Sequence, residues 1–267
     1  MGPLAVKGHL CTRQSLADDL RRLGIKQGDI ILLHSSLSSL GWVCGGAEAV
    51  VLAFLDAIGN TGTLVVPTQS GDNSDPREWK HPPVPPEWHQ VIRESIPAYD
   101  PQTTRTRGMG VIAETVRTWP NAIRSAHPQT SFTAIGHHAA ESVSGHALDC
   151  RFGENSPLAR LEALNARVVL LGVGFESCTA FHLAECRLPA SLESNSFAVT
   201  TLKGREWMTV EDTVVSGDMF DSLGSDFEKE MRVARQTVGG APTYLFPLRE
   251  AVEFAGSWLK DHHPTSA

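Results

Sequence analysis

The chain has 267 residues, of which 41% are hydrophobic and 20% are charged, and its formal net charge at pH 7 is −7. This composition is ordinary for a globular protein, and the acidic balance disfavours a nucleic acid or an anionic membrane as the partner. The five cysteines include no Cys-x-x-Cys pair, which argues against a disulfide framework and against a structural zinc site.

The amino terminus shows no targeting signal. Residues 1–7 lack the apolar stretch of a signal peptide, and Val6 stands where an N-myristoylation signal needs serine or threonine. No run in the chain approaches the ~20 apolar residues that span a bilayer. We therefore expect a cytoplasmic protein, either a monomer or a homodimer, with no membrane as a partner.

The first predicted elements are a helix and a strand. Thr12 can cap a helix that presents a leucine-rich face, and Gly24 is placed to end it. Residues 29–34 form a short apolar run of the kind that makes a buried strand. A turn rich in serine and glycine follows over 35–46. The pattern predicts a strand that opens into a polar loop.

The next elements complete a βαβ unit. Residues 47–58 have the apolar spacing of a helix, and Gly59 can end that helix. Residues 63–68 form a second short strand. The order strand, loop, helix, strand predicts a right-handed crossover between parallel strands.

The segment 71–107 has a different texture. It is rich in proline, aspartate, tryptophan and histidine, and it shows no clean period. A long irregular segment inside a compact domain is usually a functional loop or lid. A helix is predicted again over 108–119.

The remaining elements are predicted from local signals. Ser156, followed by proline, can begin a helix that leads into a strand over 168–173. Residues 194–215 suggest an antiparallel strand pair, and 225–228 fits a capping box. Residues 247–259 are amphipathic. We predict one α/β domain over 1–267, with a central and largely parallel sheet, flanking helices, inserted substrate loops and a more irregular C-terminal part.

His182 and Glu185 are the strongest candidates for chemistry. They lie three residues apart, just after the most hydrophobic strand-like run of the chain, 167–174. On a helix, residues at i and i+3 share a face, so the imidazole and the carboxylate would project together. A histidine oriented by a carboxylate is a candidate general base near neutral pH. A capping or core histidine beside a solvated glutamate would give the same spacing.

Two cysteines offer an alternative chemistry. Cys178 and Cys186 stand four residues before and after His182, so all three side chains could share one helical face. A thiol hydrolase would use such a Cys–His pair. Small buried thiols are, however, commonly packing residues.

The turn over 34–46 is a candidate phosphate site. Its hydroxyls and free backbone N–H groups precede a helix, whose N-terminal end carries partial positive charge. No Gly-Lys-Ser/Thr closes the turn, so it is neither a P-loop nor a dinucleotide fingerprint. A plain structural turn would have the same composition.

Four long stretches resemble one enzyme family, the aminoglycoside 3-N-acetyltransferases, whose fold is distinct from that of the GNAT superfamily. The matching stretches follow in order from LHSSLSSLGWVCGG to FHLAE and lie at 33–70, 86–101, 104–136 and 153–185. The resemblance covers nearly all of residues 10–190 and weakens after that.

The resemblance implies transfer of an acetyl group from acetyl-CoA to the 3-amino group of a 2-deoxystreptamine ring, as in antibiotic resistance, and no metal. It assigns the pyrophosphate of CoA to the serine turn and the following helix, the pantetheine arm to the stretch around Met109, and His34 to a supporting position in the pocket. The residues carried over for the acetyl-CoA site are His34, Ser35, Ser36, Leu37, Gly45, Gly46, Thr68, Ser70, Arg107, Gly108, Met109 and Gly110.

The resemblance implies direct transfer in a ternary complex, with His182 as the base. An ammonium group is not a nucleophile, so the acceptor must lose a proton, which His182 can take. Glu185 would either orient the imidazole or hold a substrate ammonium group. Thr179 is a candidate donor to the thioester oxygen or to the departing thiolate, and a buried structural threonine is the alternative.

An aminoglycoside carries several ammonium groups, so its site needs carboxylates. The C-terminal segment also offers Asp221, Asp226 and Glu228, and Trp88 is a possible wall of the cleft. The residues expected to bind the acceptor are Asp72, Asp75, Glu78, Trp79, Glu185 and Asp218.

The chain departs from the family pattern at Cys178, where asparagine is expected, and in its C-terminal acidic region. These departures bear on the choice of acceptor. A second hypothesis therefore keeps the acyltransferase and makes the acceptor a biosynthetic primary amine. A ligand-binding module without turnover is a further alternative. His127 is expected to shape the cofactor cleft without taking part in the chemistry.

Overall fold

The computed structural model describes residues 9–262. The N-terminal segment that bears on targeting lies outside these residues. Within the described part of the chain, no helix is both long and apolar enough to cross a membrane.

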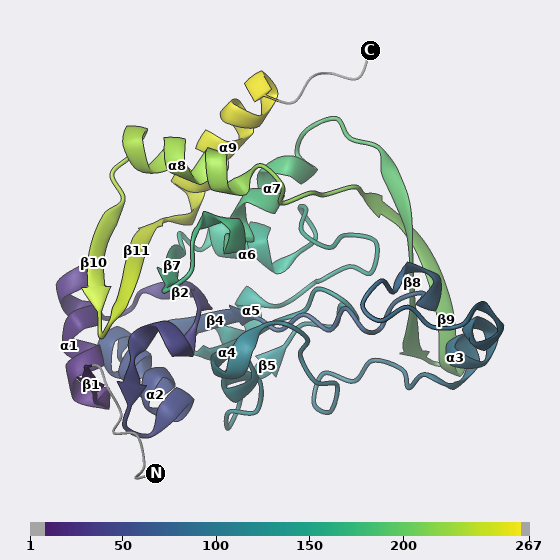
Figure 1. The fold of residues 1–267 in the computed structure, drawn as a ribbon, viewed down its shortest axis with the longest axis horizontal. Helices are drawn as coiled ribbons and strands as arrows, with labels where there is room; N and C mark the ends of the chain where they lie inside the picture. The colour runs from purple at the N-terminus through teal and green to yellow at the C-terminus, as the bar shows by residue number, and fades with distance from the viewer. Residues whose placement is uncertain (1–8, 263–267) are drawn as a thin grey trace, which may run out of the picture.

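The centre of the molecule is a seven-stranded sheet with the order β10-β11-β7-β2-β4-β6-β5 (Figure 1). Its strands are β2 (Ile30–Ser35), β4 (Thr63–Pro67), β5 (Ile123–Arg124), β6 (Phe132–Gly136), β7 (Arg167–Leu171), β10 (Ala234–Val238) and β11 (Ala241–Pro247). A short parallel pair joins β1 (Leu10–Cys11) to β3 (Trp42–Val43).

Only the middle of this sheet is parallel. β2 pairs in parallel with β4 on one side and with β7 on the other, which confirms the predicted βαβ unit. β6, β5, β11 and β10 join by antiparallel pairing. The α/β class is confirmed, but the expectation of a largely parallel sheet is wrong. The outer strands were not recognised in the sequence, and the antiparallel joining of β6 to β4 and of β11 to β7 depends on long-range pairing.

Helices cover both faces of the sheet, and the alternation of side chains along the strands explains why. Ile31 and Leu33 of β2 face one apolar core, whereas Ile30 and Leu32 face the other. The first face is covered by α1 (Arg13–Leu23), α2 (Gly46–Ile58) and α4 (Gly110–Arg117). The second face is covered by α5 (Ala139–Ser142), α6 (Pro157–Ala163), α7 (Ala180–Cys186), α8 (Phe220–Glu230) and α9 (Leu248–His262).

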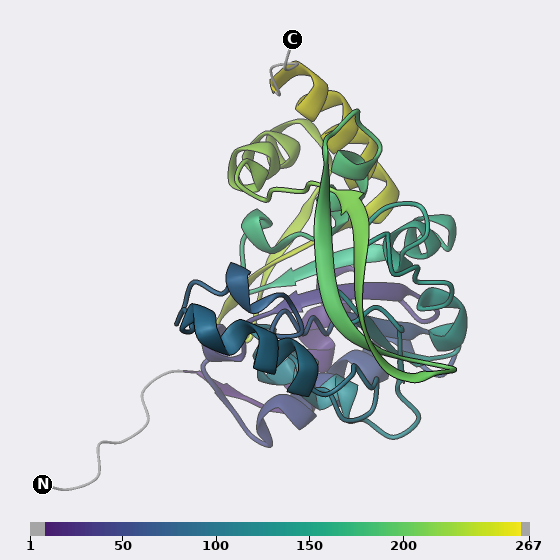
Figure 2. The ribbon, with the colours of Figure 1, turned by 90° about the vertical axis from the view of Figure 1, so that its right-hand side faces the viewer.

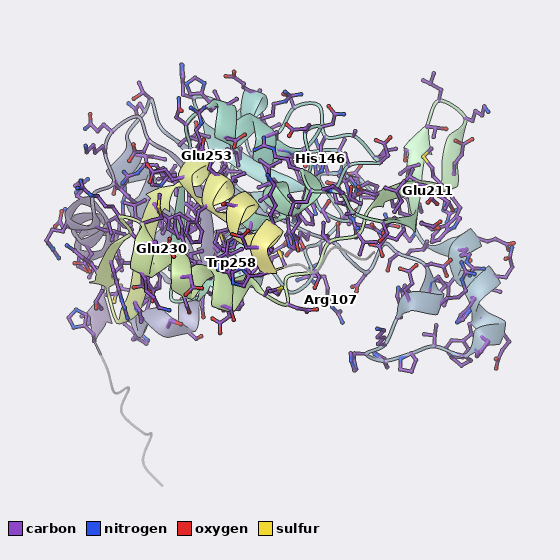
Figure 3. All side chains as sticks on the ribbon, turned by 90° about the horizontal axis from the view of Figure 1, so that it is seen from above. Arg107, His146, Glu211, Glu230, Glu253 and Trp258 are labelled. Carbon is purple, nitrogen blue, oxygen red and sulfur yellow. The ribbon has the colours of Figure 1, made fainter. Side chains whose placement is uncertain are left out.

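A long hairpin extends beside this layered body. β8 (Leu192–Thr201) and β9 (Gly204–Thr213) pair antiparallel over their full length, as predicted (Figures 1 and 2). Seen from above, the hairpin, marked by Glu211, lies well apart from α9, marked by Trp258 (Figure 3).

The irregular segment 71–107 packs against this hairpin. The amide of Asn73 bonds both backbone groups of Ala198, at 2.9 and 3.0 Å. The segment holds two short 3-10 turns, Pro76–Glu78 and Pro86–Trp88, and one helix that was not predicted, α3 (His89–Ser95).

The predicted capping box at 225–228 is wrong. These residues lie inside α8, which begins at Phe220 after Met219 and has no side-chain cap. The buried face of α8, made by Phe220, Leu223 and Phe227, starts more than a turn before Ser225, and its packing sets the start of the helix. The helices predicted from Thr12 and Ser156 are confirmed, and both caps accept a backbone N–H.

Candidate active site

A cleft of about 1060 Å³ opens at the carboxyl ends of the three parallel strands. The chain leaves β2, β4 and β7 at the same edge of the sheet, so the loops that follow them meet there. In open α/β sheets this edge is where ligands bind. The cleft is lined by residues from all three loops, from the start of α4 and from 151–152.

His182 lies on the wall of the cleft, in α7, and contacts Glu185 as its spacing predicts. Its Nδ1 is 2.6 Å from Oε2 of Glu185. The other carboxylate oxygen, Oε1, accepts the backbone N–H of Ser216 at 3.2 Å. Both oxygens of Glu185 are therefore engaged. An ionised carboxylate only accepts hydrogen bonds, so the proton of this pair sits on Nδ1 and Nε2 is left to accept a proton.

Two aromatic rings hold the imidazole of His182. The ring of Phe152 stacks on it with centroids 4.6 Å apart and an interplanar angle of 18°. The ring of Phe220 lies on it at a tilt of 54°, with centroids 4.7 Å apart. The plane of the imidazole is thus fixed by packing as well as by Glu185.

A second imidazole, that of His34, lies next to the last residue of β2 and lines the same cleft. Its Nε2 lies 3.3 Å from Oγ1 of Thr179, the residue before α7, and all three side chains His34, Thr179 and His182 line the cleft. Burial, together with the nearby His182, lowers the pKa of His34 to about 3. His34 is therefore neutral at physiological pH.

The serine turn forms one arm of the cleft. Ser35, Ser36 and Leu37 line it, and so does Gly46 at the start of α2. Gly45 does not line the cleft; it is the N-cap of α2 in the left-handed conformation. A Cβ added at Gly46 would find no atom within 4 Å, so the cleft is open at this point.

The stretch after the irregular segment forms the facing arm. Gly108, Met109 and Gly110 line the cleft at the start of α4, whereas Arg107 does not. The side chain of Arg107 is 64% exposed and lies 3.4 Å from that of Asp72.

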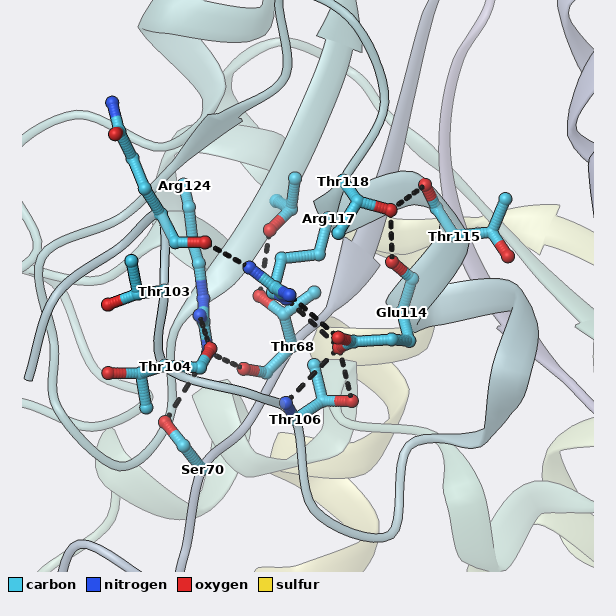
Figure 4. Close-up of polar contacts among 12 residues, drawn as sticks. Thr68, Ser70, Thr103, Thr104, Thr106, Glu114, Thr115, Arg117, Thr118 and Arg124 are labelled. Carbon is cyan, nitrogen blue, oxygen red and sulfur yellow. Dashed lines mark hydrogen bonds and ion pairs between the residues drawn. The ribbon is translucent and has the colours of Figure 1, made fainter.

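A buried arginine anchors this arm from behind (Figure 4). Arg124 is 9% exposed and donates to the backbone oxygens of Thr68 and Thr104. It thereby ties the strand end after β4 to the segment that leads into 107–110. Beside it, Arg117 binds Glu114, whose carboxylate also accepts from Thr106 (Figure 4).

The expected positions of Thr68 and Ser70 in the cleft are wrong. Both are buried: Thr68 bonds the hydroxyl of Thr133 at 2.9 Å, and Ser70 donates to the backbone of Pro128 at 2.8 Å. Their neighbours Pro67 and Gln69 line the cleft instead. Side chains of an extended chain alternate between two sides, so a shift of one residue exchanges the two sets.

The acids expected to bind the acceptor do not line the cleft. Asp75 is 2% exposed and pairs with Arg77 and Arg93 at 2.9 and 2.8 Å. Burial raises the pKa of Asp75, but the hydrogen bonds from these arginines outweigh burial and hold the pKa well below its usual value. This carboxylate stabilises the segment 75–93.

The other expected acceptor residues lie outside the lining as well. Asp72 and Asp218 are exposed, and Trp79 donates its indole N–H to Ser74 at 2.9 Å. Glu78 is exposed by surface area, yet partial desolvation of its carboxylate, together with the charges of Asp75 and Glu193, raises its pKa.

Several residues that line the cleft were not identified as site residues from the sequence. They include Gln69, Thr130, Arg151, Phe152 and Glu176. Glu176 lies in the short 3-10 turn Phe175–Ser177 after β7 and is exposed, and it is the one carboxylate that the described residues contribute to the lining. Glu176 directly precedes the segment that carries His182, so the sequence could have indicated it as a site residue. Arg151 and Phe152 reach the cleft through contacts distant in sequence.

The thiols are poorly placed for nucleophilic chemistry. α7 begins at Ala180, so Cys178 lies before the helix and does not share its face with His182. Burial raises the pKa of Cys178 and of Cys186 to about 12, and neither side chain lines the cleft. The nucleophile in such chemistry is the thiolate, which these positions disfavour. Among residues 9–262, no group of three or more histidine, cysteine, aspartate or glutamate side chains is placed to hold a metal ion.

Comparison with known proteins decides the family. A family model described as aminoglycoside 3-N-acetyltransferase matches residues 32–260. The chain belongs to this family. The expected enzyme class, an acyltransferase, is thereby confirmed.

Three relatives of this acetyltransferase bear on the site. A Bacillus subtilis protein described as the SPbeta prophage-derived aminoglycoside N(3')-acetyltransferase-like protein YokD is 45% identical over 250 residues, which cover 93% of this chain and 92% of that protein. The crystal structure of YokD covers 95% of this chain and 96% of its own, with a TM-score of 0.93.

The other two relatives are ligand complexes. AAC-IIIb, in a binary complex with CoASH, is 30% identical over 97% of this chain and 99% of its own, with a TM-score of 0.85. AAC-VIa bound to sisomicin is 30% identical over 95% of this chain and 99% of its own, with a TM-score of 0.83.

Proposed function

We propose that this acetyltransferase moves the acetyl group of acetyl-CoA to the 3-amino group of a 2-deoxystreptamine aminoglycoside, with His182 as the general base. The observation that carries the proposal is the 2.6 Å contact between Nδ1 of His182 and Glu185 on the wall of a cleft large enough for two substrates. The relatives that bind CoASH and sisomicin support this choice of donor and acceptor.

The two arms of the cleft suit the donor. We assign the pyrophosphate of acetyl-CoA to Ser35, Ser36 and the N-terminal end of α2, where hydroxyls, backbone N–H groups and the helix dipole favour an anion. The arm from Gly108 to Gly110 would line the pantetheine, because two glycines leave the backbone accessible.

The proton balance assigns two tasks to His182. The acceptor amine, after losing one proton to solvent, attacks the thioester carbon, and Nε2 of His182 takes a second proton from the nitrogen as the C–N bond forms. The C–S bond then breaks, and the imidazolium can return that proton to the departing thiolate. Glu185 keeps Nδ1 protonated and stabilises the imidazolium.

His34 and Thr179 suit the negative charge that develops on the thioester oxygen. When neutral His34 carries its proton on Nε2, it donates to Oγ1 of Thr179 across 3.3 Å. The hydroxyl hydrogen of Thr179 is then free to donate to the oxyanion in the cleft. Thr179→Val would remove this donor.

For the acceptor, we propose Glu176 as an ammonium partner, since it lines the cleft. Asp72, Glu78, Trp79 and Asp218 lie outside the lining, so they would contact the acceptor only after the segments that carry them move over it. A biosynthetic amine stays the alternative acceptor.

The proposal is tested by thiol release from acetyl-CoA with two aminoglycosides that differ only in whether the 3-amino group is free or blocked. Release with the free amine alone supports the proposed reaction and its position. If thiol is released with neither aminoglycoside but is released with other primary amines, acetyl-CoA remains the donor and the proposed acceptor is wrong.

A further inference from the structure

We propose that the ion pair between Arg151 and Asp212 is a positioning device for His182, acting through the ring of Phe152. Arg151 lines the cleft but reaches into the base of the β8–β9 hairpin. This role rests on the proposed function of His182, and it assigns to the hairpin a part in holding the catalytic base.

The hairpin holds residue 151 by both its backbone and its side chain. The backbone N–H and the Nε–H of Arg151 donate to the same oxygen, Oδ2 of Asp212, at 2.8 and 3.1 Å. The terminal nitrogen of Arg151 donates to the backbone oxygen of Thr213 at 2.7 Å and also to Glu193. The carboxylate of Asp212 is therefore the centre of a clasp that fixes the backbone just before Phe152.

Because the ion pair of Arg151 and Asp212 is buried, it is held in one arrangement. The side chains of Arg151 and Asp212 are 15% and 6% exposed, so each charge depends on the other for solvation. The second oxygen of Asp212 accepts the N–H of Thr213 at 2.7 Å, which fixes the carboxylate itself. The charged pair thus has one arrangement in which its hydrogen bonds are made.

The position of Phe152 bears directly on the base. Its ring stacks on the imidazole of His182 with centroids 4.6 Å apart, and Phe220 is the second aromatic ring in contact with that imidazole. On the far side of the dyad, Ser216 donates to Glu185 at 3.2 Å. The stretch 212–216 therefore acts on two of the groups that orient the imidazole: it contacts Glu185 directly, and through Arg151 it fixes the backbone next to Phe152.

A small displacement of the imidazole has a large effect on rate, because an error of about 1 Å in the position of a catalytic group can cost about 10²-fold. We therefore expect Asp212→Asn to lower kcat between about 10-fold and 100-fold, while KM for acetyl-CoA stays within about threefold. The KM for acetyl-CoA should stay nearly unchanged because Asp212 does not line the cleft.

Arg187→Lys is the matched control. Arg187 also joins α7 to two carboxylates, those of Glu154 and Glu162, but it neither lines the cleft nor contacts the stacked rings. Its kcat should remain within about twofold of the wild type. Arg151→Lys keeps the charge and loses the forked geometry, so its kcat should fall between those of the wild type and Asp212→Asn.

A second readout does not depend on turnover. The proton resonances of the His182 ring carry the ring-current shift of Phe152, and Phe152→Leu removes that shift. Asp212→Asn should move these resonances in the direction that Phe152→Leu moves them, and Arg187→Lys should leave them in place.

Unmoved resonances in folded Asp212→Asn would overturn the proposal, and so would moved resonances with an unchanged kcat. If Asp212→Asn does not fold, Arg151→Lys is judged by the same two readouts. If the wild type releases no thiol with any aminoglycoside, the proposed function fails, and the resonances still decide whether the clasp positions the ring.

Discussion

The substitution Glu185→Gln isolates the role of the carboxylate beside His182. Glutamate accepts two hydrogen bonds here, from Nδ1 of His182 and from the backbone of Ser216. Glutamine has the same shape but only one oxygen. If that oxygen serves Ser216, the amide NH2 faces Nδ1, which must then give up its proton, and the proton moves to Nε2. Nε2 can then no longer act as the base.

The magnitude follows from the charge that is lost. Two unit charges about 4 Å apart interact by about 4 kcal/mol at an effective dielectric constant of about 20. The negative charge of Glu185 stabilises the imidazolium that forms during transfer, and about 4 kcal/mol corresponds to about 10³-fold in rate. Loss of the tautomer acts on the same step, so we expect kcat to fall between about 10²-fold and 10⁴-fold.

The assay is steady-state thiol release at saturating acetyl-CoA and acceptor, together with the free energy of unfolding in urea. Glu154→Gln is the control, since that carboxylate is 64% exposed and, within residues 9–262, pairs with Arg187 alone. The free energy of unfolding of Glu185→Gln should lie within about 1–2 kcal/mol of that of the wild type. A folded Glu185→Gln variant with kcat within threefold of the wild type would refute the assignment of Glu185.

Three further predictions concern groups away from this dyad. Cys178→Ala should keep kcat within about threefold, because the buried thiol has a pKa of about 12 and lies outside the cleft; loss of turnover in a folded variant would revive the thiol mechanism. Asp75→Asn should lower the free energy of unfolding in urea by about 2 kcal/mol and leave kcat within threefold, because it strands Arg93 without touching the cleft; a kcat loss without destabilisation would place Asp75 in acceptor binding. Burial lowers the pKa values of His34, His127 and His146 to about 3, about 2 and about 4, so each stabilises the fold fully above the unfolded pKa of about 6.5 and loses that contribution as pH falls below it. At pH 5.5 each of the three should lower the free energy of unfolding by about 1 kcal/mol relative to pH 7.5, and together by a few kcal/mol. Equal free energies of unfolding in urea at the two pH values would contradict this.

Local signals were sufficient for much of the fold. The caps at Thr12 and Ser156 are short-range features, and the sequence pattern around them located α1 and α6. The strands β6 and β11 were missed, although each also pairs with a strand close in the chain, β5 and β10. Gly239 and Gly240, between β10 and β11, are a local hairpin signal that was not used. The joining of β6 to β4 and of β11 to β7 depends on contacts between segments distant in the chain, which no local pattern encodes.

The site residues also divide into those that local spacing predicts and those that depend on the folded chain. The contact of His182 with Glu185 follows from helical spacing alone, so the sequence was sufficient to predict it. Thr68 and Ser70 were placed on the wrong side, because the alternation of an extended chain was not applied to them. Arg151 was missed because its partner Asp212 is 61 residues away, and only the folded hairpin brings the two together.

The central claim is that His182 removes the acceptor proton in this cleft. The most direct test is the single-turnover rate of acetyl transfer by His182→Ala, measured with acetyl-CoA and an aminoglycoside that has a free 3-amino group, beside the affinity of the same variant for acetyl-CoA. We predict an affinity within about threefold of the wild type and a transfer rate at least about 10²-fold lower. Transfer at the wild-type rate in a folded His182→Ala variant would contradict the assignment of the base.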